Sequence, residues 1–167
     1  MFKPVASSEP AIQYPLWTPI GWLGLHFVGA CFTALTFESD AVCGALPEQA
    51  MPVAEEIFRY FENPEYCCRW RWPMRGTPFQ QTVLLALRQI PPGQIKTYGQ
   101  LAHELGSAPR AIGQALRRNP FPIFFPCHRV VAQRSLGGFA GHTDGHLPQV
   151  KAWLLAHEGG DSWWSDS

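Results

Sequence analysis

Hydrophobic residues in the first half of the chain follow two different repeats. Residues 22–27 and 31–37 form two strand-like runs separated by Gly29-Ala30, which is typical of a β-hairpin. Residues 53–61 place Val53, Ile57, Tyr60 and Phe61 at helical spacing, and this repeat predicts a helix. Residues 1–16 show little periodicity, so we expect an irregular extension there.

The second half is divided by clear helix start and stop signals. Thr77-Pro78-Phe79-Gln80 combines a capping box with a proline at the first helical position, which predicts a helix over residues 77–90. A second capping box starts at Thr97, and Gly106 ends that helix. Pro109 then opens a helix that continues from Arg110 to Arg118. Two short helices joined by a glycine-containing turn are typical of a helix-turn-helix.

Beyond this pair, an apolar run at residues 122–131 surrounds Cys127-His128-Arg129 and predicts a short buried strand. A glycine-rich loop follows at residues 136–141, without the lysine of a phosphate-binding loop. Pro148 is expected to open a last helix that ends at Gly159. We therefore predict an α/β (α+β) fold with a junction in the turn-rich, aromatic stretch 62–75. The expected parts are domains 1–75 and 76–160 and a tail, 161–167.

Charge is distributed unevenly between the two halves, although the net charge is zero. Residues 1–57 carry one basic and six acidic residues, a net charge of −5, whereas residues 58–151 carry twelve basic and four acidic residues, a net charge of +8. Such asymmetry indicates an acidic module attached to one that faces a polyanion. The alternative is that the arginines only form a solvated face.

Composition excludes several classes of protein. No apolar stretch is long enough to span a bilayer, and Met1-Phe2-Lys3-Pro4 lacks the apolar core of a signal peptide. The five cysteines form neither a disulfide framework nor a metal-ligand ladder. We therefore expect a soluble protein of a reducing, intracellular compartment, without a metal or cofactor.

Cys127 is the candidate nucleophile. A thiol beside cationic or basic groups can be held as the reactive thiolate, and His128 could deprotonate it while Glu158 orients the histidine. Because neighbouring residues of a strand point to opposite sides, this needs a bridging water or a bend at Pro126. Cys127 as a small buried hydrophobic residue is the alternative.

The helix from Arg110 to Arg118 has one nearly bare side. Ala111, Gly113 and Ala115 provide it, and Gly113 costs about 1 kcal/mol of helix propensity relative to alanine. A bare side allows close approach of a rigid partner, which is either another helix or a nucleic acid. Arginines at both ends of the helix suit phosphate contacts.

Residues 76–159 resemble the C-terminal domain of the O6-alkylguanine-DNA alkyltransferases. The stretches that carry the resemblance are Gly76-Thr77-Pro78-Phe79-Gln80-Gln81, Thr97-Tyr98, Arg110-Ala111-Ile112-Gly113, Asn119-Pro120, Pro126-Cys127-His128-Arg129-Val130-Val131 and Trp153-Leu154-Leu155-Ala156-His157-Glu158-Gly159. Thr18-Pro19-Ile20-Gly21 before the hairpin is weakly similar to the family's small ribonuclease-H-like N-terminal domain.

The resemblance implies a catalytic group in which Cys127 accepts the alkyl group, His128 takes its proton through a water, Glu158 orients His128, and Tyr98 protonates the leaving base or pushes its phosphate. The DNA-binding residues it implies are Arg110, Ala111, Gly113, Ala115, Arg117, Arg118, Asn119 and Arg129. Within this set Arg110 would fill the gap left by the flipped guanine, and Asn119 would tie the helix to the Cys127 segment. The implied pocket residues are Phe139, Ala140, Gly141 and Lys151.

The implied partner is double-stranded DNA bearing O6-alkylguanine, with O4-alkylthymine as a second candidate lesion. We expect a monomer without a membrane association, in the bacterial cytoplasm with access to the nucleoid. Two other readings stay open, which are a non-catalytic protein that binds alkylated DNA and a thiol hydrolase built on Cys127.

Three departures from the family pattern stand out. Leu84 replaces a frequent tryptophan, and Ala140 replaces a hydroxyl-bearing residue. The stretch 142–149 is longer than in some members, and we expect it to reshape the edge of the pocket.

Overall fold

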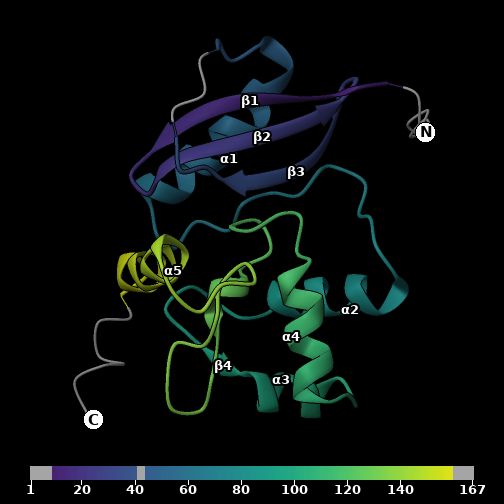
Figure 1. The fold of residues 1–167 in the computed structure, drawn as a ribbon, viewed down its shortest axis with the longest axis vertical. Coiled ribbons are helices and arrows are strands. Elements are labelled where there is room, and N and C mark those ends of the chain that lie inside the picture. The colour runs from purple at the N-terminus through teal and green to yellow at the C-terminus, as the bar shows by residue number, and fades with distance from the viewer. Residues whose placement is uncertain (1–8, 41–43, 160–167) are drawn as a thin grey trace.

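The computed structural model describes residues 9–40 and 44–159. Strands β1 (Ala11–Thr18), β2 (Gly21–Val28) and β3 (Cys31–Phe37) form an antiparallel sheet in the order β1-β2-β3. A short 3₁₀ helix, η1 (Glu48–Ala50), leads into helix α1 (Met51–Glu62), which covers one face of the sheet (Figure 1). The predicted hairpin and the predicted helix are both confirmed.

The expectation of an irregular extension over residues 1–16 is wrong for its second part. Residues 11–18 form strand β1, which pairs with β2 along its whole length. The strand is hard to recognise because Pro15 interrupts it and because Leu16 and Trp17 place large apolar side chains on both faces. Proline is tolerated because β1 is an edge strand. Residues 1–8 lie outside the described residues.

The second half consists mainly of helices around a two-stranded parallel pairing (Figure 1). Its elements are α2 (Pro78–Leu87), β4 (Lys96–Thr97), α3 (Tyr98–Glu104), α4 (Pro109–Arg117), β5 (Val130–Val131) and α5 (His146–His157). Both predicted capping boxes are present, at Thr77 and Thr97. Helices α3 and α4 pack against each other on either side of the Gly106 turn, as a helix-turn-helix requires. Helix α5 begins two residues before the predicted Pro148.

The predicted strand through Cys127 is wrong. Residues Cys127–Arg129 form a 3₁₀ helix, η2, and only Val130–Val131 are a strand. The chain turns tightly here, since Cys127 N donates to Phe125 O (2.7 Å) and Arg129 N donates to Pro126 O (3.1 Å). A short buried apolar run does not distinguish strand from helix by its periodicity, and the turn therefore escapes a sequence pattern.

An aromatic cluster joins the two halves at the predicted junction. Trp70 packs on Phe121 with ring centroids 4.3 Å apart, and Phe32 of β3 contacts both rings. Buried residues from residue 16 to residue 154 form one continuous core. The division into domains 1–75 and 76–160 stays a prediction, and the tail 161–167 lies outside the described residues.

Phe32→Ala is expected to lower the free energy of unfolding by about 3–5 kcal/mol, because it empties a fully buried ring site at the junction. The matched control is Phe58→Ala, whose ring is 41% exposed and whose loss should cost less than about 1 kcal/mol. Urea unfolding followed by tryptophan fluorescence measures both. Equal losses in the two variants would contradict the assignment of Phe32 to the junction.

Candidate active site

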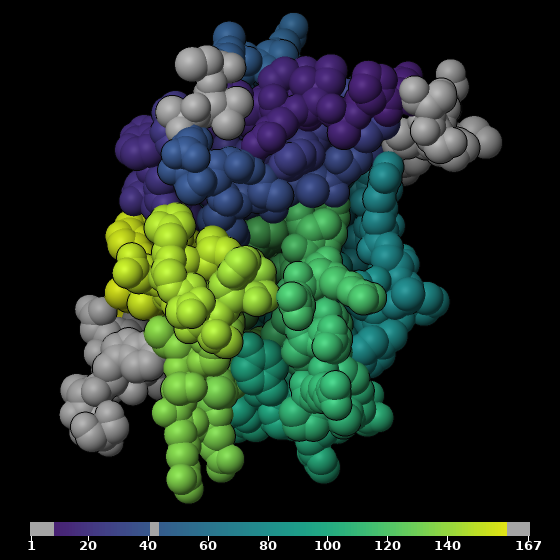
Figure 2. All heavy atoms as spheres, viewed as in Figure 1, coloured from purple at the N-terminus to yellow at the C-terminus, as the bar shows by residue number. Residues whose placement is uncertain are grey.

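A cavity of about 320 Å³ lies between helix α4 and the glycine-rich loop. Figure 2 shows the corresponding recess between the green helix α4 and the yellow-green segment that leads into α5. The residues that line it are Tyr98, Arg110, Gly113, Gln114, Leu116, Arg117, Cys127, Gly138, Phe139, Ala140, Gly141 and Thr143. The cavity therefore brings together the predicted acceptor thiol, the start of the helix-turn-helix recognition helix and the predicted pocket loop.

Cys127 is 7% exposed and lines this cavity. Burial raises the pKa of its thiol above the ordinary value, while Asn119 and the charge of Lys151 act in the opposite direction. The expected thiolate held by flanking cations is therefore not the resting form. A buried thiol with a raised pKa needs a base when it reacts.

His128, the next residue in the chain, is fully buried and pairs with Glu158. Its Nε2 lies 2.8 Å from Glu158 Oε1, and both side chains are fully buried. Burial lowers the pKa of His128, so the ring is neutral at pH 7. Burial also disfavours the charge of Glu158, but hydrogen bonds and charges from His128 and Arg129 hold the pKa of that carboxyl well below its usual range. Because the ionised carboxylate only accepts, Nε2 carries the proton and donates.

The other ring nitrogen, His128 Nδ1, is buried and has no hydrogen-bond partner among residues 9–40 and 44–159. In the Nε2–H tautomer it is an acceptor with a free lone pair. This arrangement suits a base that receives a proton through Nδ1 while Glu158 stabilises the resulting imidazolium.

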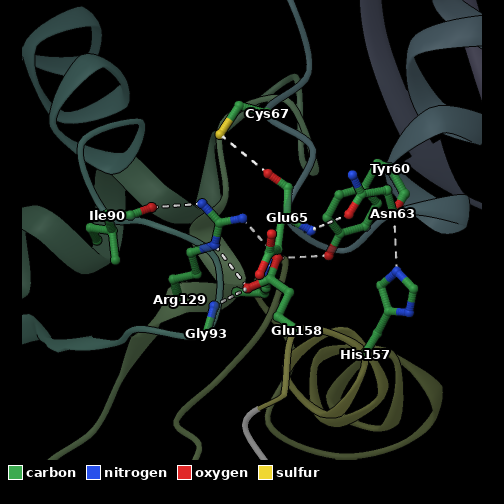
Figure 3. Close-up of polar contacts among 10 residues, drawn as sticks. Tyr60, Asn63, Glu65, Cys67, Ile90, Gly93, Arg129, His157 and Glu158 are labelled. Carbon is green, nitrogen blue, oxygen red and sulfur yellow. Dashed lines mark hydrogen bonds and ion pairs between the residues drawn. The ribbon is translucent and has the colours of Figure 1, made fainter.

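The structure contradicts the DNA-binding role predicted for Arg129. Its guanidinium is 6% exposed and donates to both oxygens of Glu158, at 2.8 and 2.9 Å, and to Ile90 O at 2.6 Å (Figure 3). Arg129 instead balances the buried negative charge of Glu158, as isolated buried charges require.

The predicted DNA-binding role of Ala115 is also contradicted by the structure. It is 5% exposed and lies on the side of α4 that faces α2, so it is unavailable to DNA. Gly113 lies on the opposite, open side, where an added Cβ would have no neighbour within 4 Å. Among the described residues, no other helix therefore packs against Gly113. Ala111, the third small residue, is half-buried.

Arginines frame the open side of α4. Arg110 and Arg117 line the cavity from the two ends of the helix, and Arg118 is exposed. Asn119 follows the helix, where its Nδ2 donates to Phe125 O (2.9 Å) and its Oδ1 accepts from Phe121 N (3.0 Å). These bonds connect the end of α4 to the segment that carries Cys127.

The glycine-rich loop forms the opposite wall. Phe139 is buried and packs on Phe37 of β3 at 5.3 Å, and Ala140 has a positive φ of 48°. A Cβ on Gly141 would lie 2.8 Å from Arg117 Nε, so the glycine lets the side chain of Arg117 pack closely against the loop. Tyr98 Oη donates to Gly138 O at 3.4 Å. Thr143, from the stretch expected to alter the pocket edge, does line the cavity.

Lys151 binds backbone carbonyls of the glycine-rich loop but does not line the cavity. Its Nζ donates to Val130 O (2.7 Å), Leu136 O (2.6 Å) and Gly138 O (3.0 Å), which uses all three of its protons. Burial lowers the pKa of Lys151 to about 8, against the opposing charge of Cys127. Its predicted pocket role is therefore indirect, through the loop and through the thiol.

Three residues of the site region escaped the sequence analysis, which are Tyr60, Gln114 and Leu116. Gln114 follows Gly113 on α4 and is exposed in the cavity; its position four residues after Arg110 was the available signal. Tyr60 lies on α1, and its hydroxyl donates a hydrogen bond to Glu158 Oε1 at 2.8 Å (Figure 3). The helical repeat of α1 alone gave no indication of that contact.

Two features are absent from residues 9–40 and 44–159, a metal-binding group and a membrane-spanning helix. No group of three or more His, Cys, Asp or Glu side chains is arranged to hold a metal ion. No helix in those ranges has the length and apolar character needed to cross a membrane.

Comparison with known proteins agrees with this geometry. The family described as "6-O-methylguanine DNA methyltransferase, DNA binding domain" matches residues 78–160. A methylated-DNA–protein-cysteine methyltransferase of Archaeoglobus fulgidus is 37% identical over 64% of this chain and 73% of its own length. One from Salmonella typhimurium is 52% identical over 50% of this chain, and the match spans about half of its length (48%).

A solved structure of Mycobacterium tuberculosis OGT in complex with DNA superposes with a TM-score of 0.72 at 30% identity, over 88% of this chain and 92% of that chain. The likeness thus extends beyond the DNA-binding domain to the mixed α/β fold of both halves. On these grounds the chain belongs to the methylated-DNA–protein-cysteine methyltransferase family, the O6-methylguanine-DNA methyltransferases.

Proposed function

We propose that this protein repairs DNA by transferring the alkyl group of O6-alkylguanine to Cys127 in a single turnover. The observation that carries the proposal is the position of Cys127. Its thiol lines the cavity beside α4, and the next residue, His128, is buried and hydrogen-bonded to Glu158. DNA as the partner is supported by the relative solved in complex with DNA.

The reaction forms a bond between Cys127 Sγ and the alkyl carbon, and it breaks the bond between that carbon and guanine O6. The thiol proton passes through a water to His128 Nδ1, whose lone pair is free. Tyr98 lines the same cavity and protonates the departing guanine. Burial raises the pKa of Tyr98, so its hydroxyl carries the proton that the leaving base requires.

The lesion reaches the thiol by leaving the base stack. Extrusion of a base costs a few kcal/mol and is easiest for a damaged base. The open side of α4 at Gly113 lets the helix approach the minor groove closely, while Arg110 enters the duplex and Arg117 and Arg118 contact phosphates. Neutralised phosphates make this binding dependent on salt.

Two other functions compete with alkyl transfer. A non-catalytic lesion-binding protein has no use for a thiol with a base behind it, and a hydrolase has no use for the open, arginine-framed side of α4. A thioether has no easy hydrolytic exit, so each protein molecule accepts one alkyl group. We further propose that the protein acts as a monomer inside the cell, in the compartment that holds the DNA.

Mixing the protein with an excess of duplex DNA that contains O6-methylguanine is expected to add one methyl group per chain, and no more. Cys127→Ala should gain no mass, whereas Cys67→Ala, which removes an exposed thiol, should behave as the wild type. Intact-protein mass spectrometry measures both. Binding without any gain of mass would overturn alkyl transfer and favour the non-catalytic function. The same assay with O4-methylthymine tests the second lesion.

Arg110→Ala should slow transfer from duplex DNA by about 10- to 100-fold, because the unstacked base is no longer replaced in the helix. Transfer from free O6-benzylguanine, which needs no base flipping, should stay within twofold of the wild-type rate. The control is Arg134→Ala, which removes an exposed arginine outside the cavity. Equal slowing with both substrates would contradict a role of Arg110 in flipping.

Lys151→Met should make Cys127 less reactive toward iodoacetamide without DNA, by about tenfold for one unit of thiol pKa. The charge of Lys151 lowers the pKa of Cys127, so its loss raises that pKa and reduces the thiolate fraction. Lys96→Met is the control, since Lys96 pairs with Glu104 on the surface. A Cys127 as reactive in Lys151→Met as in Lys96→Met would show that Lys151 acts only on the loop.

A further inference from the structure

We propose that Tyr60 is a positioning residue of the alkyl-transfer reaction, whose hydroxyl orients Glu158 and limits how strongly that carboxylate holds the proton of His128. The inference rests on the proposed function. Tyr60 lies on α1, 98 residues before Glu158 in the sequence, so the N-terminal half would complete the catalytic group of the other half.

The contacts around Glu158 carry the proposal (Figure 3). Oε1 accepts hydrogen bonds from Tyr60 Oη, His128 Nε2 and Arg129 Nη2, each at 2.8 Å. Oε2 accepts from Arg129 Nε at 2.9 Å and from Gly93 N at 3.4 Å. Tyr60 and His128 therefore share one oxygen atom, and a change in one bond must alter the other.

Tyr60 is itself held rigidly in place. Its ring is 1% exposed and meets the ring of His157 edge-on at 5.4 Å. His157 Nε2 lies 3.0 Å from the backbone carbonyl of Tyr60, as Figure 3 also shows. Burial and the neighbouring Glu158 raise the pKa of Tyr60 far above its ordinary value. The hydroxyl is thus always protonated and donates to the carboxylate.

The sign of the effect follows from the groups that face His128. Cys127 and Arg129 belong to its own segment, Lys151 and Glu158 come from α5 and its end, and Tyr60 comes from α1. Glu158 raises the pKa of His128, whereas burial, Arg129 and Lys151 lower it. A carboxylate relieved of one donor is a stronger acceptor, so loss of the Tyr60 hydroxyl should raise the pKa of His128.

Tyr60 could instead be only a core residue, and Tyr66 provides the matched control. Its hydroxyl donates at 2.7 Å to a different carboxylate, Glu56 Oε2, which also accepts from Arg69 N at 2.6 Å. Glu56 is buried, and its carboxylate pairs with Arg59 and Arg71 besides Tyr66 and Arg69 N, so its recorded partners do not include the His128–Glu158 pair. Tyr60→Phe and Tyr66→Phe therefore each delete one hydroxyl-to-carboxylate bond and keep the ring.

The experiment is the pH dependence of single-turnover methyl transfer from duplex DNA between pH 5 and 9. The imidazolium form of His128 cannot act as a base, so the pKa of His128 determines where the transfer rate falls at low pH, the acid limb of the pH–rate profile. Tyr60→Phe should move that limb to higher pH by about half a unit to one unit, the size expected for one hydrogen bond. Tyr66→Phe should leave it unchanged. An acid limb in Tyr60→Phe that coincides with the wild type would overturn the proposal.

A second substitution covers the case in which Tyr60→Phe does not fold. Replacement of Tyr60 by 3-fluorotyrosine keeps the ring and the hydroxyl but makes a stronger donor, so the acid limb should move to lower pH. An unchanged limb would count against Tyr60 as a positioning residue.

A third readout separates the two proposals. The ¹⁵N resonances of His128 in the DNA-free protein report its tautomer and its pKa without any alkyl transfer. If the wild type fails to accept methyl groups, the proposed function fails, while the NMR titration still tests the link from Tyr60 to His128. If the wild type is active and both Tyr60 substitutions leave His128 unchanged, only the link fails.

Discussion

The buried carboxylate of Glu158 is the interaction on which the rest of the site depends. A buried negative charge is costly unless it is paired and hydrogen-bonded, and here Arg129, His128 and Tyr60 supply the required donors. These donors come from α1 and from η2, and the carboxylate itself ends α5. One ion therefore fixes three elements relative to one another. It also fixes the tautomer of His128, because only the protonated Nε2 can satisfy it.

The environment of Cys127 balances two opposing requirements. Burial raises the pKa of the thiol, which lowers the fraction of reactive thiolate. The charge of Lys151 lowers that pKa, and in the proposed reaction His128 acts as the base. Lys151 has a double role, since the three carbonyls that it binds also set the shape of the loop opposite α4. Pocket shape and thiol reactivity are thus coupled through one ammonium group.

Short-range features of the fold were predictable from residues close together in the chain. The capping boxes at Thr77 and Thr97 are bonds between residues three apart, and the hairpin at Gly29 needs only a turn between two strand-like runs. Predictions failed where long-range context decides. Strand β1 was missed because its edge position, which tolerates Pro15, belongs to the sheet rather than to the strand. The segment at Cys127 was misassigned because its tight turn is buried between two apolar runs, which resemble a buried strand.

The sequence by itself determined the helix pair, the family, and the candidate cysteine with its neighbouring histidine, because these are carried by local motifs. Only the tertiary structure decided which arginines are exposed and which are buried in ion pairs. Arg110 and Arg129 are equivalent in a charge pattern. In the structure, however, Arg110 lines the cavity, whereas Arg129 forms a buried ion pair with Glu158. Only the fold likewise brings Tyr60 into contact with Glu158. Charge balance and proton affinity depend on neighbours in space, and a contact across 98 residues leaves no mark in a local pattern.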